Sequence, residues 1–125
     1  MIHGVGTDIV AILRLGELLA RHKDRTLEKC LAPQERDDCL ASNDPARFLA
    51  KRFAAKEALG KALGTGIRTP VLLPAIEIIH DELGKPSFRF HGELATFIDQ
   101  RQLRCHLSLS DERDTVVAFV VIEAP

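Results

Sequence analysis

The stretch FLAKRFAAKEALGKALGTG, residues 48–66, decides the fold, because it reads as one long helix on which the rest of the chain can pack. Just upstream, Asn43 and Asp44 offer a capping side chain, and Pro45 suits the first helical position. Downstream, Gly64 and Gly66 supply a stop signal. The sequence therefore predicts a helix over Pro45–Leu63.

This predicted helix is strongly basic and holds a single acid. Between residues 45 and 68 the only carboxylate is Glu57, and the Lys/Arg residues are Arg47, Lys51, Arg52, Lys56, Lys61 and Arg68. A lone carboxylate among cations is the kind of group that holds a metal ion while its neighbours hold phosphate.

The whole chain is less unusual than this helix. Its 125 residues suit one domain with one core, and the hydrophobic (46%) and charged (28%) fractions are typical of a globular protein. A net charge of −1 argues against a general nucleic-acid binder, because acids elsewhere offset the basic helix: Glu35, Asp37, Asp38 and Asp44. Three cysteines without metal-site spacing, and no apolar run that could span a membrane or form a signal peptide, predict a soluble cytoplasmic domain.

The remaining pattern mixes helices and hairpins. Besides the long helix, we expect helical segments around residues 12–21, at Thr26–Leu31, Pro33–Ala41 and His91–Arg101, and strands at Ile2–Val10, Ile76–His80, Ser87–Phe90, Arg104–Ser110 and Thr115–Glu123. Hairpin connections dominate, which favours an α+β fold with a largely antiparallel sheet packed on the long helix. The apolar run Val116–Ile122 is expected in the core, with an intersubunit role as an alternative.

Glu57 and Lys61 are four residues apart and so share one face of the helix. The simplest interpretation is a surface ion pair worth a few tenths of a kcal/mol. Gly60 lies between them, where it costs about 1 kcal/mol relative to alanine, and it suggests that something approaches the helix closely.

Asp8 follows Gly6 and Thr7 at the end of the first predicted strand. It could cap the next helix, or it could be an oxygen ligand. Since Mg²⁺ usually takes one or two protein carboxylates and fills its other positions with water and phosphate, Asp8 and Glu57 would suit it if the fold brings them together.

Gly64 and Gly66 could be only a helix stop, or they could let a ligand approach the backbone. No P-loop and no Ser/His/Asp or Cys/His set is present, so a nucleophile would come from the substrate.

Two segments in this order resemble the holo-acyl-carrier-protein synthases, the small bacterial 4′-phosphopantetheinyl transferases. They are GVGTDIV at residues 4–10 and the stretch at residues 48–66. The resemblance extends to residues 81–86 and 107–110 and to the total length, so it implies one transferase domain over residues 1–125. It further implies transfer of phosphopantetheine from coenzyme A to a serine of an acyl carrier protein of fatty-acid synthesis, with release of adenosine 3′,5′-bisphosphate.

By the same resemblance, Asp8 and Glu57 are the Mg²⁺ ligands and Lys61 meets the phosphates. Further candidate contacts to coenzyme A are Lys51, Arg52, Lys56, Gly64 and Gly66. The family implies a homotrimer with intersubunit active sites, and an acidic carrier protein that docks on the first helix, where Arg14 and Arg21 are candidates.

Asp111 departs from the histidine that many relatives carry at that place. The rival interpretations are a metal-dependent phosphohydrolase and a non-catalytic carrier-protein or nucleotide-binding module. We expect no nucleic-acid or membrane partner.

Overall fold

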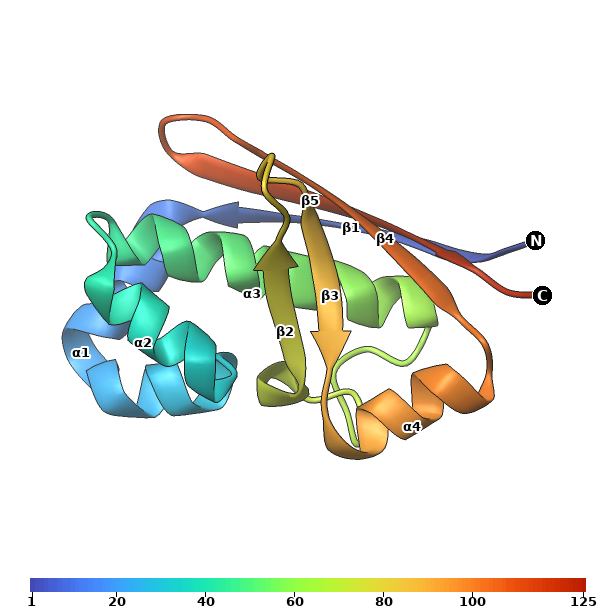
Figure 1. Ribbon diagram of the computed structural model, residues 1–125. Helices are drawn as coiled ribbons and strands as arrows, with labels where there is room; N and C mark the ends of the chain where they lie inside the picture. The colour runs from blue at the N-terminus through green and yellow to red at the C-terminus, as the bar shows by residue number, and fades with distance from the viewer.

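The computed structural model describes residues 1–125 as an α+β domain built around one central helix, α3 (Figure 1). The elements in chain order are β1 (Ile2–Ala11), α1 (Ile12–Cys30), α2 (Pro33–Ala41), α3 (Pro45–Leu63), the short 3₁₀ helix η1 (Leu73–Ala75), β2 (Ile76–His80), β3 (Pro86–Phe90), α4 (Gly92–Gln100), β4 (Arg104–Asp111) and β5 (Thr115–Glu123). These bounds confirm the predicted elements, and the two helical segments expected before residue 31 form one helix with a break at His22.

Helix α3 begins and ends as predicted. The Asp44 carboxylate accepts a hydrogen bond from the Arg47 backbone N–H at 3.1 Å, and Gly64 ends the helix in the left-handed conformation with φ 79°. In Figure 1 the β1, β5 and β4 strands lie along one side of α3, the β2–β3 hairpin crosses it, and α1 with α2 and α4 lie toward its two ends.

The strands form two antiparallel sheets rather than one. The larger has the order β1-β5-β4, and the β2–β3 hairpin forms the smaller. Along β5, side chains alternate: Val116 and Val120 are buried, and Val117 and Phe119 are exposed on the opposite face. The expected core role of this strand is thus confirmed, and its outer face remains apolar.

Strand β1 lies unusually close to α3 because it carries glycine where it faces the helix. A Cβ at Gly4 would overlap the carbonyl oxygen of Ala62, and one at Gly6 would overlap that of Ala58. The alanines of α3 and the glycines of β1 therefore bring the two backbones together. This contact positions the end of β1 over the middle of α3.

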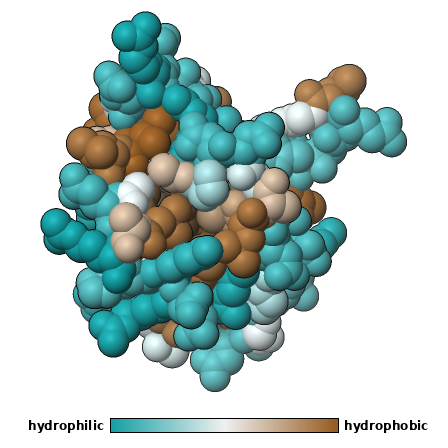
Figure 2. All heavy atoms as spheres, turned by 90° about the vertical axis from the view of Figure 1, so that its left-hand side faces the viewer, coloured by the Kyte–Doolittle hydropathy of each residue, from teal (hydrophilic) through white to brown (hydrophobic).

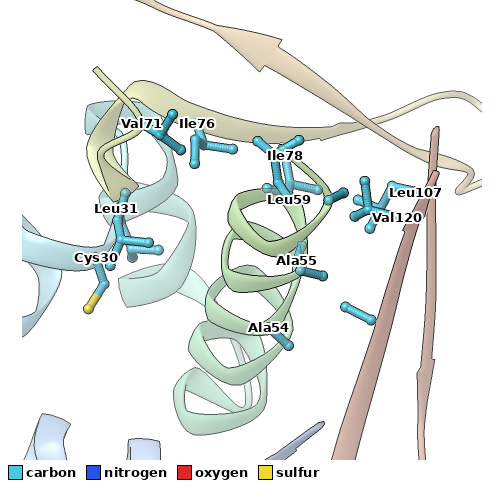
Figure 3. Packing of buried hydrophobic residues seen from close by; sticks show 14 of the residues in the cluster. Cys30, Leu31, Ala54, Ala55, Leu59, Val71, Ile76, Ile78, Leu107 and Val120 are labelled. Atoms are coloured by element: carbon cyan, nitrogen blue, oxygen red, sulfur yellow. The ribbon is translucent and has the colours of Figure 1, made fainter. Parts of the chain in front are cut away.

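The core fills the space between α3 and the elements around it (Figure 3). Ala55 and Leu59 of α3 face Leu107 and Val120 of the larger sheet, and Ile78 of β2 lies close by. None of the helices combines the length and the apolar character that a membrane crossing requires.

Candidate active site

Asp8 and Lys61 meet where β1 crosses α3. Asp8 lies two residues after Gly6, on the strand face that turns toward the helix. The Lys61 ammonium donates hydrogen bonds to Asp8 Oδ1 at 3.1 Å and to the Thr7 carbonyl at 2.9 Å. The Glu57–Lys61 ion pair is absent from this structure, and Lys61 bonds across to the strand instead. That simplest interpretation of the helix pattern is therefore wrong.

Glu57 lies close enough to Asp8 for the two carboxylates to affect each other. Burial raises the pKa of Glu57 above its ordinary value, and the negative charge of Asp8 raises it further, while the charges of Lys61 and Arg14 oppose the shift. A divalent cation bound between the two carboxylates would stabilise the charged form of Glu57, which burial and the charge of Asp8 disfavour. The donor set fits Mg²⁺, which completes its shell with water and phosphate oxygens. No third His, Cys, Asp or Glu joins this pair in a metal-binding group.

A second cluster of cations lies near the start of α3. Arg47, Phe48, Lys51 and Arg52 line a hollow of about 170 Å³ together with Ser42 and Asp44. The Arg52 guanidinium stacks over the Phe48 ring at 4.1 Å from the centroid. Burial, with the positive charges of Arg52 and Lys51, lowers the pKa of His80 at the end of β2. Three cations thus line this hollow, and the carboxylates of Asp44 and Asp111 offset part of their charge.

Lys56 makes all its hydrogen bonds inside the protein. It is fully buried, and its ammonium donates to Glu35 Oε1 at 2.6 Å, to the Cys30 carbonyl at 2.8 Å and to the Leu73 carbonyl at 2.9 Å. Three acceptors use all three N–H groups of a lysine. The expectation that Lys56 contacts a phosphate group of the ligand is therefore wrong.

Gly60 is approached by the chain itself. The Gly66 N–H donates to the Gly60 carbonyl at 3.0 Å, and a Cβ at Gly60 would lie 3.0 Å from the Ile67 side chain. Gly64 and Gly66 have φ values of 79° and 65°, and the space where their Cβ atoms would lie is open. Both glycines are needed for the turn, and their contact with a ligand stays a prediction.

Arg14 and Arg21 lie on α1, and the charge of Arg14 acts on Glu57 of the carboxylate pair. They line a shallow hollow of about 200 Å³ with Glu17 and Leu18. Arg14 also lies over the Phe53 ring, with its Cζ 5.5 Å from the centroid. The helix predicted to receive a carrier protein thus adjoins the carboxylate pair.

Sequence reasoning missed two residues that organise this region. Glu35, interpreted only as an acid that offsets charge, is 1% exposed, and its carboxylate accepts from the backbone N–H groups of Ala32 and Ile78, both at 2.9 Å. Glu35 makes one half of a capping box by accepting from the Ala32 N–H, but the other half needs a Ser or Thr where Ala32 stands, so the sequence offered no complete signal for it. Arg47 bonds Asp111 Oδ2 at 2.6 Å and the carbonyls of residues 112 and 113, which holds the β4–β5 turn on α3.

The predicted site residues do not all converge in one chain. Asp8, Glu57 and Lys61 come together with Arg14 nearby, whereas Lys51 and Arg52 line the separate basic hollow. A larger hollow, of about 550 Å³, lies between residues 69–75 and the start of α4 and includes none of these residues. We therefore place the candidate site at the crossing of β1 and α3.

Comparison with known proteins gives a consistent family. Residues 4–120 match the family model of the 4′-phosphopantetheinyl transferase superfamily. The chain is 59% identical to a holo-[acyl-carrier-protein] synthase of Azoarcus sp. (strain BH72), with 98% of each chain covered. It is similar to the crystal structure of holo-[acyl-carrier-protein] synthase from Neisseria meningitidis, with a TM-score of 0.94, 45% identity and coverage of 98% and 99%. It is also similar to a synthase from Bacillus anthracis in complex with CoA (3′,5′-ADP), with a TM-score of 0.83, 35% identity and coverage of 100% and 99%.

Proposed function

The chain belongs to the 4′-phosphopantetheinyl transferase superfamily, in its holo-[acyl-carrier-protein] synthase family, and on that premise we propose its reaction, metal and assembly. It transfers the phosphopantetheine group of coenzyme A to a serine of an acyl carrier protein of fatty-acid synthesis. The serine oxygen bonds to the phosphorus that carries pantetheine, the pyrophosphate bridge breaks, and adenosine 3′,5′-bisphosphate leaves. The observation that carries this proposal is the meeting of Asp8, Glu57 and Lys61 in a chain of this family.

Asp8 and Glu57 are the residues that would hold Mg²⁺. When bound there, the ion would neutralise charge on the pyrophosphate and on the departing bisphosphate. Glu57 would also position a water that accepts the serine proton, so no histidine is required. The Lys61 ammonium exchanges its bonds to Asp8 and the Thr7 carbonyl for bonds to the phosphates, which its exposed side chain can reach from solvent.

The geometry of α3 supports an active site shared between subunits. At about 100° per residue, Arg52 and Lys51 lie about 140° and about 120° around the helix axis from Glu57, in opposite directions. One coenzyme molecule can therefore hardly contact Glu57, Lys51 and Arg52 of the same helix at once. We propose that Lys51 and Arg52 serve the site of a neighbouring copy.

The outer face of the larger sheet offers the surface for that assembly. Ile9 pairs with Val117 and Thr7 with Phe119, and the apolar members of these pairs are all exposed. A contiguous apolar sheet face on a single chain is typical of an interface. We propose a homotrimer, the assembly that the family resemblance predicts.

The carrier protein docks on α1 in this proposal. Figure 2 shows the α1–α2 end of the molecule, where apolar patches lie among hydrophilic side chains. Leu13 and Leu18 of α1 are exposed, and Arg14 and Arg21 line the hollow that includes Leu18. Cationic side chains around an apolar patch suit an acidic carrier protein, and they would mainly speed its encounter.

A cytoplasmic location, expected from the sequence, is consistent with three free cysteines.

The direct test is to mix the protein with coenzyme A, Mg²⁺ and apo-acyl carrier protein and to measure the mass of the carrier. The expected result is addition of one phosphopantetheine group and release of the bisphosphate, with loss of both products when the metal is chelated. Release of product from coenzyme A without carrier protein would indicate the phosphohydrolase instead. Metal-independent binding of coenzyme A with no reaction would indicate a non-catalytic module.

A further inference from the structure

Two cations compete for one buried carboxylate beneath the basic hollow. Lys56 Nζ lies 2.6 Å from Glu35 Oε1, whereas Arg52 Nε lies 3.6 Å from Glu35 Oε2, beyond hydrogen-bonding distance. Oε2 is instead bonded by the Ile78 N–H. Lys56 thus has the stronger contact, although both side chains belong to adjacent turns of α3.

The result is a buried donor without an acceptor. Arg52 Nε is the one buried side-chain nitrogen or oxygen of the chain that has no hydrogen-bond partner. Lys56, Glu35 and Arg52 together carry two positive charges and one negative charge, and all three are at most 9% exposed. The negative charge of Asp38 also acts on Arg52, yet the Arg52 Nε–H still has no acceptor, so one further anion bound to this guanidinium would stabilise the cluster.

The position of Arg52 indicates where that anion binds. Arg52 lines the 170 Å³ hollow together with Lys51 and Arg47. Arg47 is occupied by Asp111 at 2.6 Å, and Lys51 is held more loosely by the same carboxylate at 3.4 Å. Among these cations, Arg52 has the longest contact with a carboxylate, at 3.6 Å from Glu35.

We propose that Lys56 is a positioning residue for coenzyme binding, because it occupies the Glu35 carboxylate and so keeps Arg52 free for a phosphate group. This inference rests on the proposed function. Glu35 is already the carboxylate nearest to Arg52, and without the Lys56 charge Arg52 is its only cationic partner, so a direct charge-assisted bond forms inside the protein. The guanidinium is then withdrawn from the hollow, and the affinity for coenzyme A falls although Lys56 never touches it.

The inference predicts rescue by a second substitution. Lys56→Met should weaken coenzyme A binding about tenfold or more, which corresponds to about 1.4 kcal/mol. Lys56→Met combined with Glu35→Gln removes the competing carboxylate, so its affinity should return to within about threefold of the wild type. In an Arg52→Met background, Lys56→Met should have no further effect, because the residue through which it acts is gone.

Dissociation constants for coenzyme A, measured by isothermal titration calorimetry on the full chain, test these expectations. Each variant is titrated well below its melting temperature, and Lys23→Met, which removes an exposed lysine of α1, is the control for lost charge. Lys56→Gln, which removes the charge but keeps groups that can bond the Cys30 and Leu73 carbonyls, replaces Lys56→Met if the latter does not fold. Wild-type affinity in the single variant, or no recovery in the double variant, would overturn the inference.

A purely structural role of Lys56 gives a different pattern. It predicts that the double variant is at least as impaired as the single one, in melting temperature and affinity alike. Failure of the inference is also distinct from failure of the proposed function. If the wild-type protein modifies the carrier and all variants bind coenzyme A with equal affinity, the role of Lys56 is refuted and the transferase activity is not.

Discussion

Replacing Gly6 with alanine should damage both the fold and the site, because this residue sets the distance between β1 and α3. The added Cβ would overlap the Ala58 carbonyl oxygen and would lie 2.7 Å from the Ala62 nitrogen and 3.0 Å from Lys61 Cβ. Two of these three are backbone atoms of a helix and cannot rotate away, so the strand has to move. Overpacking of this kind typically costs about 1–3 kcal/mol, and a rigid backbone favours the upper end.

The measurements are thermal unfolding and carrier modification. For a domain of this size, a loss of about 3 kcal/mol lowers the melting temperature by about 10 °C. Since Asp8 lies two residues further along β1, a strand shift of about 1 Å could lower kcat/KM about 100-fold below the new melting temperature. Gly16→Ala on α1 is the matched control for stability: its Cβ would lie 3.3 Å from Ala46 Cβ of α3, a tight contact with a side-chain methyl group and not with backbone, and the better helix propensity of alanine opposes its cost, so the melting temperature should stay near that of the wild type. A Gly6→Ala protein that melts within about 2 °C of the wild type and modifies the carrier normally would refute this account of the β1–α3 contact.

Three further substitutions test the catalytic, electrostatic and assembly parts of the account. Glu57→Gln should lower kcat at least about 100-fold with little change in melting temperature, and near-normal turnover in this variant would remove Glu57 from the metal site. Asp111→Asn should lose less than about 1 kcal/mol of unfolding free energy at pH 7. Burial alone would raise the pKa of Asp111, but the hydrogen bond from Arg47 and the charge of Lys51 lower it below 3.8, so its contribution to stability is present above that pH and disappears as the pH falls through the lowered pKa. Urea unfolding should therefore show that the free energy of unfolding falls less between pH 7 and pH 3 for Asp111→Asn than for the wild type. Asp99→Asn on α4 is the control and should show the same fall as the wild type. Phe119→Arg places a charge on the outer sheet face and should give a monomer in sedimentation analysis with activity lost, and a fully active trimer would contradict the proposed interface.

Local signals were sufficient for the elements of this fold. The Asp44–Pro45 start and the Gly64 stop of α3 act within a few residues, so the sequence predicts both ends of the helix. Pairing between distant segments was not predictable in the same way. The register of β1 on β5, which aligns Asp8 with Ala118, follows from packing both strands on α3, and no short-range pattern encodes it. The same limit explains why the β2–β3 hairpin could not be assigned to a separate sheet.

The glycines of β1 illustrate a signal that was present but open to more than one interpretation. Gly4 and Gly6 alternate along the strand, so they lie on one face, and α3 is rich in alanine. Together these facts would allow a close strand–helix contact, and only the structure identifies the Ala58 and Ala62 carbonyls as the partners. The Asp8–Lys61 bond depends on that contact, which is why the spacing of Glu57 and Lys61 alone led to the wrong ion pair.

Lys56 and Lys61 show why a basic helix cannot be assigned residue by residue from composition. Each lies on α3, yet Lys56 is 0% exposed and saturated by acceptors from α1, α2 and the segment before β2, whereas Lys61 is exposed and adaptable. The difference arises because α1, α2 and η1 cover one side of α3. A lysine on that side would destabilise the folded protein unless buried acceptors bonded its ammonium. Arg52, one turn before Lys56 on the same side, reaches the edge of that cover and keeps an unpartnered Nε. These three cations of α3 thus differ by face: Lys56 is buried and bonded inside the protein, Lys61 is exposed and bonded to Asp8, and Arg52 keeps one donor without an acceptor. A coenzyme with two separated phosphate regions would need the last two of these.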